Sequence, residues 1–92
     1  MPPGAKTRAH YHSEADRGNY VIRGRIRYFF GTPDNQQIID AEAGDFIFTP
    51  KGEIHWQMNL SDTETAEFIG TYIGCEDRDK SGKTWVESPL EK

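Results

Sequence analysis

Glycines and prolines recur at short intervals along this chain, and that spacing constrains its fold more than any other feature. The segments between them are rich in Val, Ile, Phe, Tyr and Thr, which favour strands. No stretch longer than a turn or two repeats its apolar residues at helical spacing between capping residues. The sequence therefore predicts an all-β fold built from short strands.

Six runs have the composition of strands: 6–12, 20–31, 36–40, 45–49, 55–59 and 65–73. Run 20–31 is the longest, and we expect it to form one strand. Its even-numbered apolar residues, from Tyr20 to Phe30, would then share one face, with Val21, three arginines and Phe29 on the other. A short edge strand is expected at 84–86, within the charged C-terminal tail 76–92. Short, evenly spaced strands are typical of a small barrel or jelly roll.

Length and charge limit what such a fold can do. Ninety-two residues make one domain, 1–92, so any site lies inside it. With 11 Lys and Arg against 15 Asp and Glu the net charge is −4, and we expect no nucleic-acid partner. No apolar stretch is long enough for a membrane span or signal peptide. A single cysteine, Cys75, suits a reducing compartment, so we expect a cytoplasmic protein with no membrane partner.

The three histidines, His10, His12 and His55, are candidate metal ligands. His10 and His12 are two residues apart on a predicted strand, so both imidazoles point to one face. Two ligands of a single transition metal can come from such a pair. Neighbouring surface histidines are also common, so this pair alone is a weak signal.

A more specific pattern surrounds His55. It reads Gly, five residues, Pro, one residue, Gly, two residues, His, three residues, Asn, and the matching residues are Gly44, Pro50, Gly52, His55 and Asn59. At average residue usage the Gly-Pro-Gly triple alone would match about two in ten thousand starting positions. The two glycines suit tight turns, and the proline ends a strand where no backbone donor is needed. Segment 44–59 resembles the second motif of the cupin superfamily.

The first cupin motif has a counterpart over 4–24, with one departure. Its matching positions are Gly4, His10, His12 and Gly24. The motif's glutamate position falls on Arg17 when counted back from Gly24, and on Asp16 when counted forward from His12. A β-bulge at Gly18 would turn Asp16 inward, so Asp16 is the preferred fourth ligand. Glu14 is a weaker candidate, and a site of three histidines with no carboxylate is the remaining alternative.

The resemblance implies a double-stranded β-helix, the jelly-roll barrel of cupins, with a divalent transition metal (Fe, Mn, Ni or Zn) in its lumen. Cupins usually have strands before the His-x-His strand, whereas only nine residues precede His10 here. An uncovered sheet edge promotes association. Three explanations stay open: a partner chain supplies the missing edge, the sequence is truncated, or the barrel is unusually open. We expect a homodimer, for which strand exchange is one route.

Strand phase suggests which residues line a substrate pocket. Gln57 shares the face of His55 and is expected in the pocket, whereas Asn59 is expected to brace the following turn. Arg17 would either hold an anion near the metal or lie in solvent. Arg23 belongs to an arginine stripe that could hold an acidic substrate, although such stripes are more often solvated. The residues expected to form the core include Phe46, Phe48, Trp56, Phe68 and Tyr72.

The function that this resemblance most often implies is that of a metal-dependent enzyme. A metal held by His10, His12, His55 and Asp16 keeps positions for substrate or dioxygen, which suits a dioxygenase acting on a small hydroxylated or oxo-acid substrate. The same site could polarise a carbonyl for isomerase, cyclase or lyase chemistry without oxygen. A non-enzymatic cup that binds or senses a small ligand is the alternative from another class of function.

Overall fold

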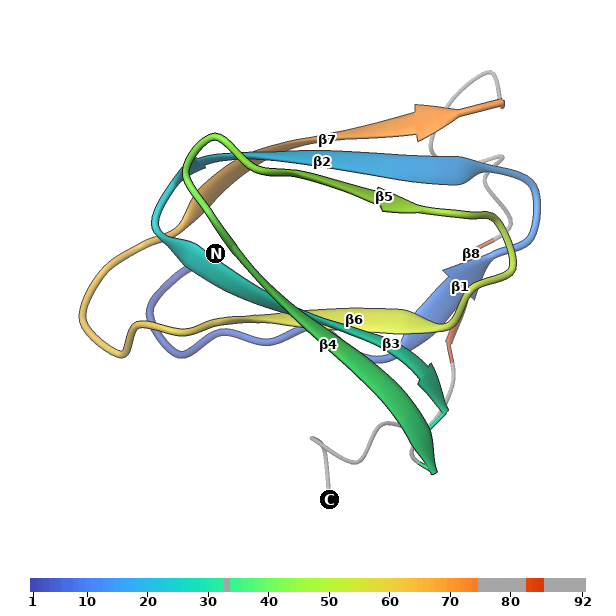
Figure 1. The fold of residues 1–92 in the computed structure, drawn as a ribbon, viewed down its shortest axis with the longest axis horizontal. Helices are drawn as coiled ribbons and strands as arrows, with labels where there is room; N and C mark the ends of the chain where they lie inside the picture. Colours follow the sequence, from blue (N-terminus) through green and yellow to red (C-terminus); the bar gives the residue numbers. More distant parts are fainter. Residues whose placement is uncertain (33, 75–82, 86–92) are drawn as a thin grey trace.

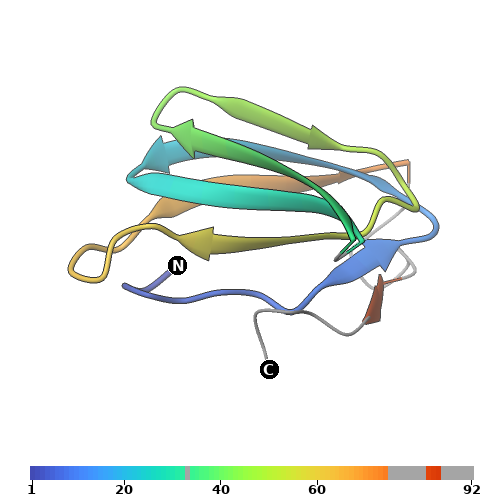
Figure 2. The same ribbon diagram turned by 60° about the horizontal axis from the view of Figure 1, so that its bottom comes forward.

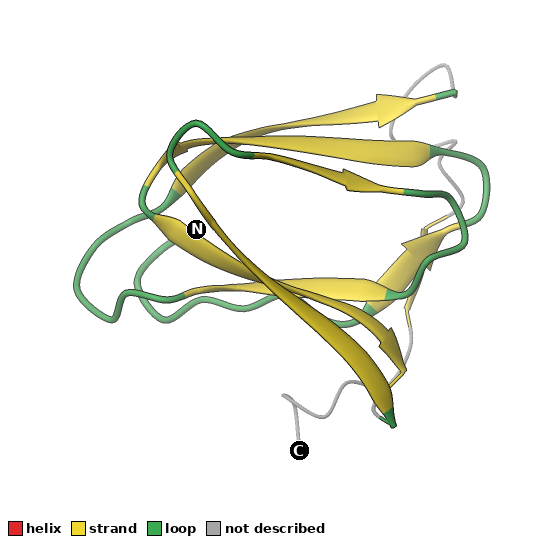
Figure 3. Ribbon diagram, in the orientation of Figure 1, coloured by secondary structure: helices red, strands yellow, loops and turns green. Residues whose placement is uncertain are grey.

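All regular structure in the described residues is extended. A computed structural model describes residues 1–32, 34–74 and 83–85, and within them it contains strands and no helix (Figure 3). The strands are β1 (His10–His12), β2 (Asp16–Arg23), β3 (Arg25–Thr32), β4 (Asn35–Glu42), β5 (Phe46–Thr49), β6 (His55–Asn59), β7 (Glu67–Ile73) and β8 (Lys83–Trp85). Cys75 and most of the charged tail, 76–82 and 86–92, lie outside the described residues.

The strands form two antiparallel sheets that face each other (Figure 1). One sheet has the order β4-β3-β6-β1-β8 and the other the order β5-β2-β7. Figure 2 shows the N-terminal segment running beside β6 at the border of the larger sheet. This arrangement confirms the predicted all-β jelly roll. No helix in the described residues is long and apolar enough to cross a membrane.

The core lies between the two sheets and is built from inward-facing residues of both. Its buried members are Val21, Ile26, Tyr28, Phe30, Ala41, Ile47 and Ala66. A second, smaller cluster lies on the opposite face of the larger sheet, where the Phe29 ring stacks on Trp56 at 5.2 Å between ring centroids. On that opposite face of β3 only Phe29 is buried, whereas Arg25 and Arg27 stay exposed or half-exposed.

Run 20–31 is two strands, and the prediction of a single strand was wrong. The chain turns from one sheet to the other at Gly24, whose φ of +88° is easily reached only by glycine. The turn also reverses the alternation of inward and outward residues. Val21 and Ile26 are fully buried, whereas Tyr20 is 46% and Ile22 45% exposed. Tyr20 and Ile22 therefore do not share the buried face of Ile26, Tyr28 and Phe30.

The core prediction for the aromatic residues holds only in part. Trp56 is buried, and Phe68 packs half-buried against the core. Phe46 and Phe48 are 56% and 49% exposed, because the inward positions of β5 are taken by Ile47 and Thr49. The prediction that these two phenylalanines pack in the core was wrong.

The edge beside the His-x-His strand is covered by the same chain. Strand β8 pairs antiparallel with β1, with His10 opposite Trp85 and His12 opposite Lys83. This places the edge strand expected at 84–86 over residues 83–85, at the border of the larger sheet. Of the three explanations for a missing edge, a partner chain is not needed at β1, since β8 occupies that position. The homodimer itself stays a prediction.

Candidate metal centre

Three buried imidazoles meet inside the barrel. One ligand nitrogen of each of His10, His12 and His55 can be chosen so that all three lie within 4.8 Å of one another. The local cause is simple: His10 and His12 share one face of β1, and His10 lies directly opposite His55 in the pairing of β1 with β6. The ring centroids of His10 and His55 are 4.3 Å apart. This spacing suits three ligands of one metal ion.

Backbone carbonyls orient two of these rings. His10 Nδ1 lies 2.8 Å from the carbonyl oxygen of Arg8, and His55 Nδ1 lies 3.0 Å from that of Glu53. Because a carbonyl only accepts, each Nδ1 carries the proton, and in the neutral ring Nε2 keeps its lone pair. This is the usual arrangement of a metal-binding histidine. The donor set therefore fits a divalent transition metal of the kind that imidazole binds.

The cluster borders a small cavity of about 100 Å³. The lining residues are Thr7, His10, Arg17, His55, Gln57, Phe68 and Tyr72. Two predicted pocket residues, Gln57 and Arg17, are thus beside the histidines. Tyr72, which was expected to pack in the core, lines this cavity and contacts the His12 ring edge-on at 5.1 Å between centroids.

Asp16 lies outside the histidine cluster. The pairing of β2 with β5 and with β7 runs without interruption through Gly18, and the irregularity in its pairing with β7 falls between Val21 and Arg23. The bulge expected at Gly18 is therefore absent, so Arg17 faces the interior and Asp16 does not. Asp16 instead accepts a hydrogen bond of 2.8 Å from the Lys51 backbone amide.

Two further acidic or basic candidates are also away from the cavity. Glu14 is exposed in the loop between β1 and β2 and does not join the cluster. Arg23 lies at the far end of β2, six residues and about 20 Å along the strand from Arg17. There it forms an exposed ion pair with Glu67 at 2.9 Å. The structure thus does not place Arg23 in the pocket with His55.

A polar network that the sequence analysis missed connects the two sheets beside the cavity. Asn19, 4% exposed on β2, donates from Nδ2 to the Tyr28 hydroxyl at 3.2 Å and to Gln57 Oε1 at 3.3 Å. Its Oδ1 accepts from Arg17 Nε at 3.2 Å. Burial raises the pKa of Tyr28, opposed in part by its hydrogen bond with Asn19 and by the charge of Arg17. The only signal in the sequence was an Asn two residues from Arg17, which by itself indicates little.

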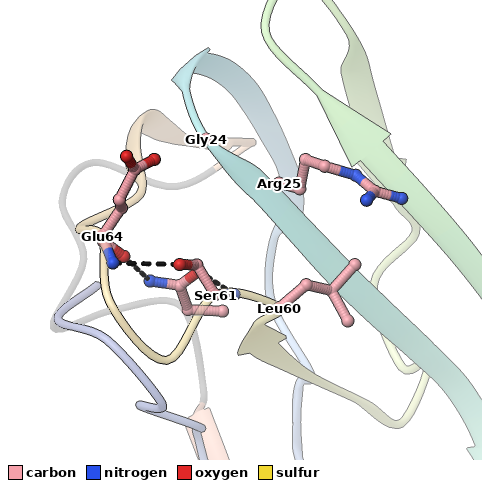
Figure 4. Close-up of a pocket in the computed structure, with 6 residues that line it drawn as sticks. Gly24, Arg25, Leu60, Ser61 and Glu64 are labelled. Atoms are coloured by element: carbon pink, nitrogen blue, oxygen red, sulfur yellow. Dashed lines mark hydrogen bonds between the residues drawn. The ribbon is translucent and has the colours of Figure 1, made fainter.

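A second cavity, of about 150 Å³, lies at the opposite end of β6, where Asn59 ends the strand (Figure 4). In this view Ser61 and Glu64 lie together on the loop, and the Arg25 side chain points away from them. Asn59 Nδ2 is within hydrogen-bond distance of the carbonyls of Met1, Pro2 and Glu64, and Asn59 Oδ1 accepts from the Ser61 amide. Asn59 therefore braces the turn, as expected, and this cavity is separate from the histidines.

Comparison with known proteins agrees with the fold. Residues 1–72 match the family model described as the cupin domain. The chain belongs to the cupin family. It is 32% identical over 71 residues to germin-like protein subfamily 3 member 2 of Arabidopsis thaliana, an alignment that covers 76% of this chain and 31% of the relative.

Solved cupin structures superpose closely on this one. An oxalate oxidase matches with a TM-score of 0.76 at 23% identity, over 94% of this chain and 42% of the other. A Bacillus subtilis oxalate decarboxylase variant matches at 0.74 and 26%, over 89% and 21%. A Klebsiella pneumoniae protein with a double-stranded β-helix domain matches at 0.78 and 23%, over 96% and 70%. This cupin spans about a third of its germin-like relative and less than half of the oxalate oxidase.

Within the cupin framework, position 17 is the unusual feature. His10, His12 and His55 occupy the histidine positions of the two motifs, whereas the acidic position counted back from Gly24 holds Arg17. No carboxylate of the described residues joins this histidine cluster. The arrangement is therefore a centre of three imidazoles with a guanidinium beside them.

Proposed function

We propose that this cupin is a metal-dependent enzyme that acts on a small hydroxylated or oxo-acid, with His10, His12 and His55 as the metal ligands. The observation that carries the proposal is the convergence of three buried, carbonyl-oriented imidazoles beside a cavity. A divalent transition metal held there supplies a Lewis acid with open coordination positions for substrate oxygens. Iron, manganese, nickel and zinc all suit this donor set.

The size of the cavity supports a small substrate. About 100 Å³ equals the liquid volume of roughly three water molecules, so it accommodates a molecule with only a handful of non-hydrogen atoms. Oxalate and glycolate are of this size. Similar cupin structures are described as oxalate oxidase, as oxalate decarboxylase and as oxalate oxidase in complex with the substrate analogue glycolate. Small carboxylic acids are accordingly the substrate class to test first.

The residues around the cavity have separable tasks in this proposal. Gln57 lines the cavity beside His55, with its Oε1 accepting from Asn19 and its Nε2 donating to Met1 Sδ. Phe68 and Tyr72, both half-buried, form the apolar part of the cavity wall. A hydroxylated acid entering the cavity would then be oriented by polar groups on one side and would contact apolar surface on the other.

The reaction type within this proposal is oxygen-dependent, as in a dioxygenase. The alternative within this proposal is isomerase, cyclase or lyase chemistry without oxygen. It would use the same three metal ligands and would differ only in its substrate. The cytoplasmic location of the protein stays a prediction. A non-enzymatic ligand-binding cup is the competing proposal, and it predicts binding of small acids without turnover.

Elemental analysis of the purified protein beside His55→Ala tests the proposal first. We expect close to one equivalent of transition metal per chain in the parent and a loss of most of it in the variant. Arg23→Met, altered at the far end of β2, serves as a control that keeps its metal. Small hydroxy and oxo-acids are then supplied with and without oxygen. Absence of metal after reconstitution contradicts the proposal, and metal with ligand binding but no turnover favours the cup.

A further inference from the structure

Arg17 is held in a prepared position beside the histidines. Its Nε donates to Asn19 Oδ1, and its Cζ lies 4.6 Å from the centroid of the Tyr72 ring, a cation–π contact. Gly70 of the neighbouring strand leaves the necessary room, because a Cβ at that position would lie 2.9 Å from Arg17 Cζ and would overlap a terminal nitrogen. The Asn19 amide, the Tyr72 ring and the space beside Gly70 thus orient the guanidinium of Arg17.

No acid in the described part of the chain neutralises the charge of Arg17. Among the described residues, no carboxylate lies within ion-pair distance of Arg17. Arg17 is the only permanently charged residue among the described residues that line the cavity, and the buried polar residues of that part of the chain include no Asp or Glu. A cavity with these walls attracts an anion, and a bound divalent cation would increase that attraction.

We propose that Arg17 is the residue that binds the carboxylate of an acid substrate, in the position where the cupin motif has an acidic residue. The inference rests on the proposed function, because it assigns the partner of that same cavity. A guanidinium presents parallel N–H donors that match the two oxygens of a carboxylate. The exchange of a carboxylate for a guanidinium at this position converts a fourth metal ligand into a substrate anchor. This selects monoanionic and dianionic acids over neutral molecules of the same shape.

Calorimetric titration with glycolate and with its neutral analogue glycolamide tests this assignment. The parent protein, Arg17→Met, Gly70→Ala and the control Arg23→Met are compared, each in metal-loaded and metal-free form. We expect Arg17→Met to weaken glycolate binding about 10- to 100-fold and to leave glycolamide binding and metal content unchanged. Gly70→Ala retains the charge but displaces the guanidinium, so it should weaken glycolate binding in the same direction. Arg23→Met should bind glycolate like the parent.

The outcomes separate this inference from the proposed function. A protein that binds no metal contradicts the proposed function, and the metal-free titrations then decide the role of Arg17 by themselves. Glycolate binding that is equally tight in the parent and in Arg17→Met overturns the inference. So does a parent protein that binds no glycolate in either form. Unfolding temperatures of each variant show that a lost signal is not a lost fold.

A separate observation concerns the outer face of the smaller sheet. Six large apolar side chains on β5, β2 and β7 are between 44% and 62% exposed: Tyr20, Ile22, Phe46, Phe48, Ile69 and Ile73. The strand register makes them neighbours, because Tyr20 lies between Phe46 on one side and Ile69 on the other. All six lie on the outer face of the three-stranded sheet, and we call this surface the outer apolar face.

The outer apolar face has the size of a dimer contact. Its six side chains expose roughly 600 Å², at or above the largest apolar patch of a typical monomer. A stable interface buries roughly 800 Å² on each partner, and the polar residues at the rim of this face would supply the difference. A three-stranded sheet face can meet a copy of itself about a twofold axis, with β2 near the centre.

We propose that the outer apolar face is the interface of a homodimer. Light scattering during size exclusion at micromolar concentration tests it on the full chain. We expect a dimer for the parent and a monomer for Ile69→Lys, since a lysine there would be buried against apolar surface. Ile38→Lys is the matched control, because Ile38 is 53% exposed on β4 of the other sheet and should leave the dimer intact. A monomeric parent overturns the proposal, as does a dimeric Ile69→Lys.

Discussion

At the scale of single residues, the interior of this cupin depends on a few polar side chains with several partners each. Asn19 contacts Arg17, Tyr28 and Gln57, and so connects the smaller sheet to the larger one beside the histidines. Buried polar groups of this kind stabilise the fold only while each keeps its partner. The orientation of the cavity wall therefore depends on one amide.

Ionisation of the buried Tyr28 hydroxyl should make the stability of the folded state fall at high pH. Burial raises the pKa of Tyr28 above its ordinary value of 10.0, so the folded state holds this proton more tightly than the unfolded chain. Its contribution to stability is complete below pH 10 and is lost as the pH rises through the folded-state pKa. Denaturant midpoints between pH 8 and pH 11, measured at ~0.5 unit steps, should fall more steeply for the parent than for Tyr28→Phe. Parallel curves would contradict this.

At the scale of elements, the junction of β2 and β3 decides which faces are buried. Gly24 turns the chain from the smaller to the larger sheet, and the alternation of inward residues changes there from odd to even numbers. A continuous strand would place Tyr20 and Ile22 in the core. The outer apolar face exists because this junction turns them outward.

Substitutions at two glycines separate backbone strain from crowding. Gly24 and Gly44 both have a φ near +90°, but only Gly24 has a neighbour close to where a Cβ would lie, Ala66 at 3.0 Å. Gly44→Ala should cost about 1–2 kcal/mol from strain alone. Gly24→Ala should cost about 1 kcal/mol more, because Ala66 is in the packed core. Urea unfolding measures both, and equal losses would argue against crowding at Gly24.

At the scale of the whole molecule, a metal at the histidine cluster would connect parts that are far apart in sequence. His10 and His12 belong to the N-terminal strand and His55 to β6, so the bound state favours the folded chain over the unfolded one. In this respect the proposed metal has a structural effect in addition to its chemical one.

Metal binding should therefore raise the unfolding temperature. At a metal concentration of about 100 times Kd the gain is about 2.7 kcal/mol, which corresponds to roughly 10 °C or more in a domain of this size. Scanning calorimetry with added metal and with chelator measures the difference. His55→Ala should lose most of it, whereas Arg23→Met should retain it. An unfolding temperature that does not change when metal is added would exclude specific binding to the folded state.

Sequence alone was sufficient for features set by local geometry. The turns at Gly44, Pro50 and Gly52, the strand character of the intervening runs, and the shared face of His10 and His12 all follow from backbone preferences and from the two-residue period of a strand. The all-β jelly roll follows from the same signals taken together. Each of these features depends on residues within a few positions of one another.

Tertiary structure decided what depends on pairing between distant segments. Whether Asp16 or Arg17 faces the histidines is set by the register of β2 against β5 and β7, and a shift of one residue would exchange them. The coverage of the β1 edge by β8 and the exposure of Phe46 likewise come from partners far along the chain. Local preferences do not encode such pairings, because they arise only when the two sheets bury one common core.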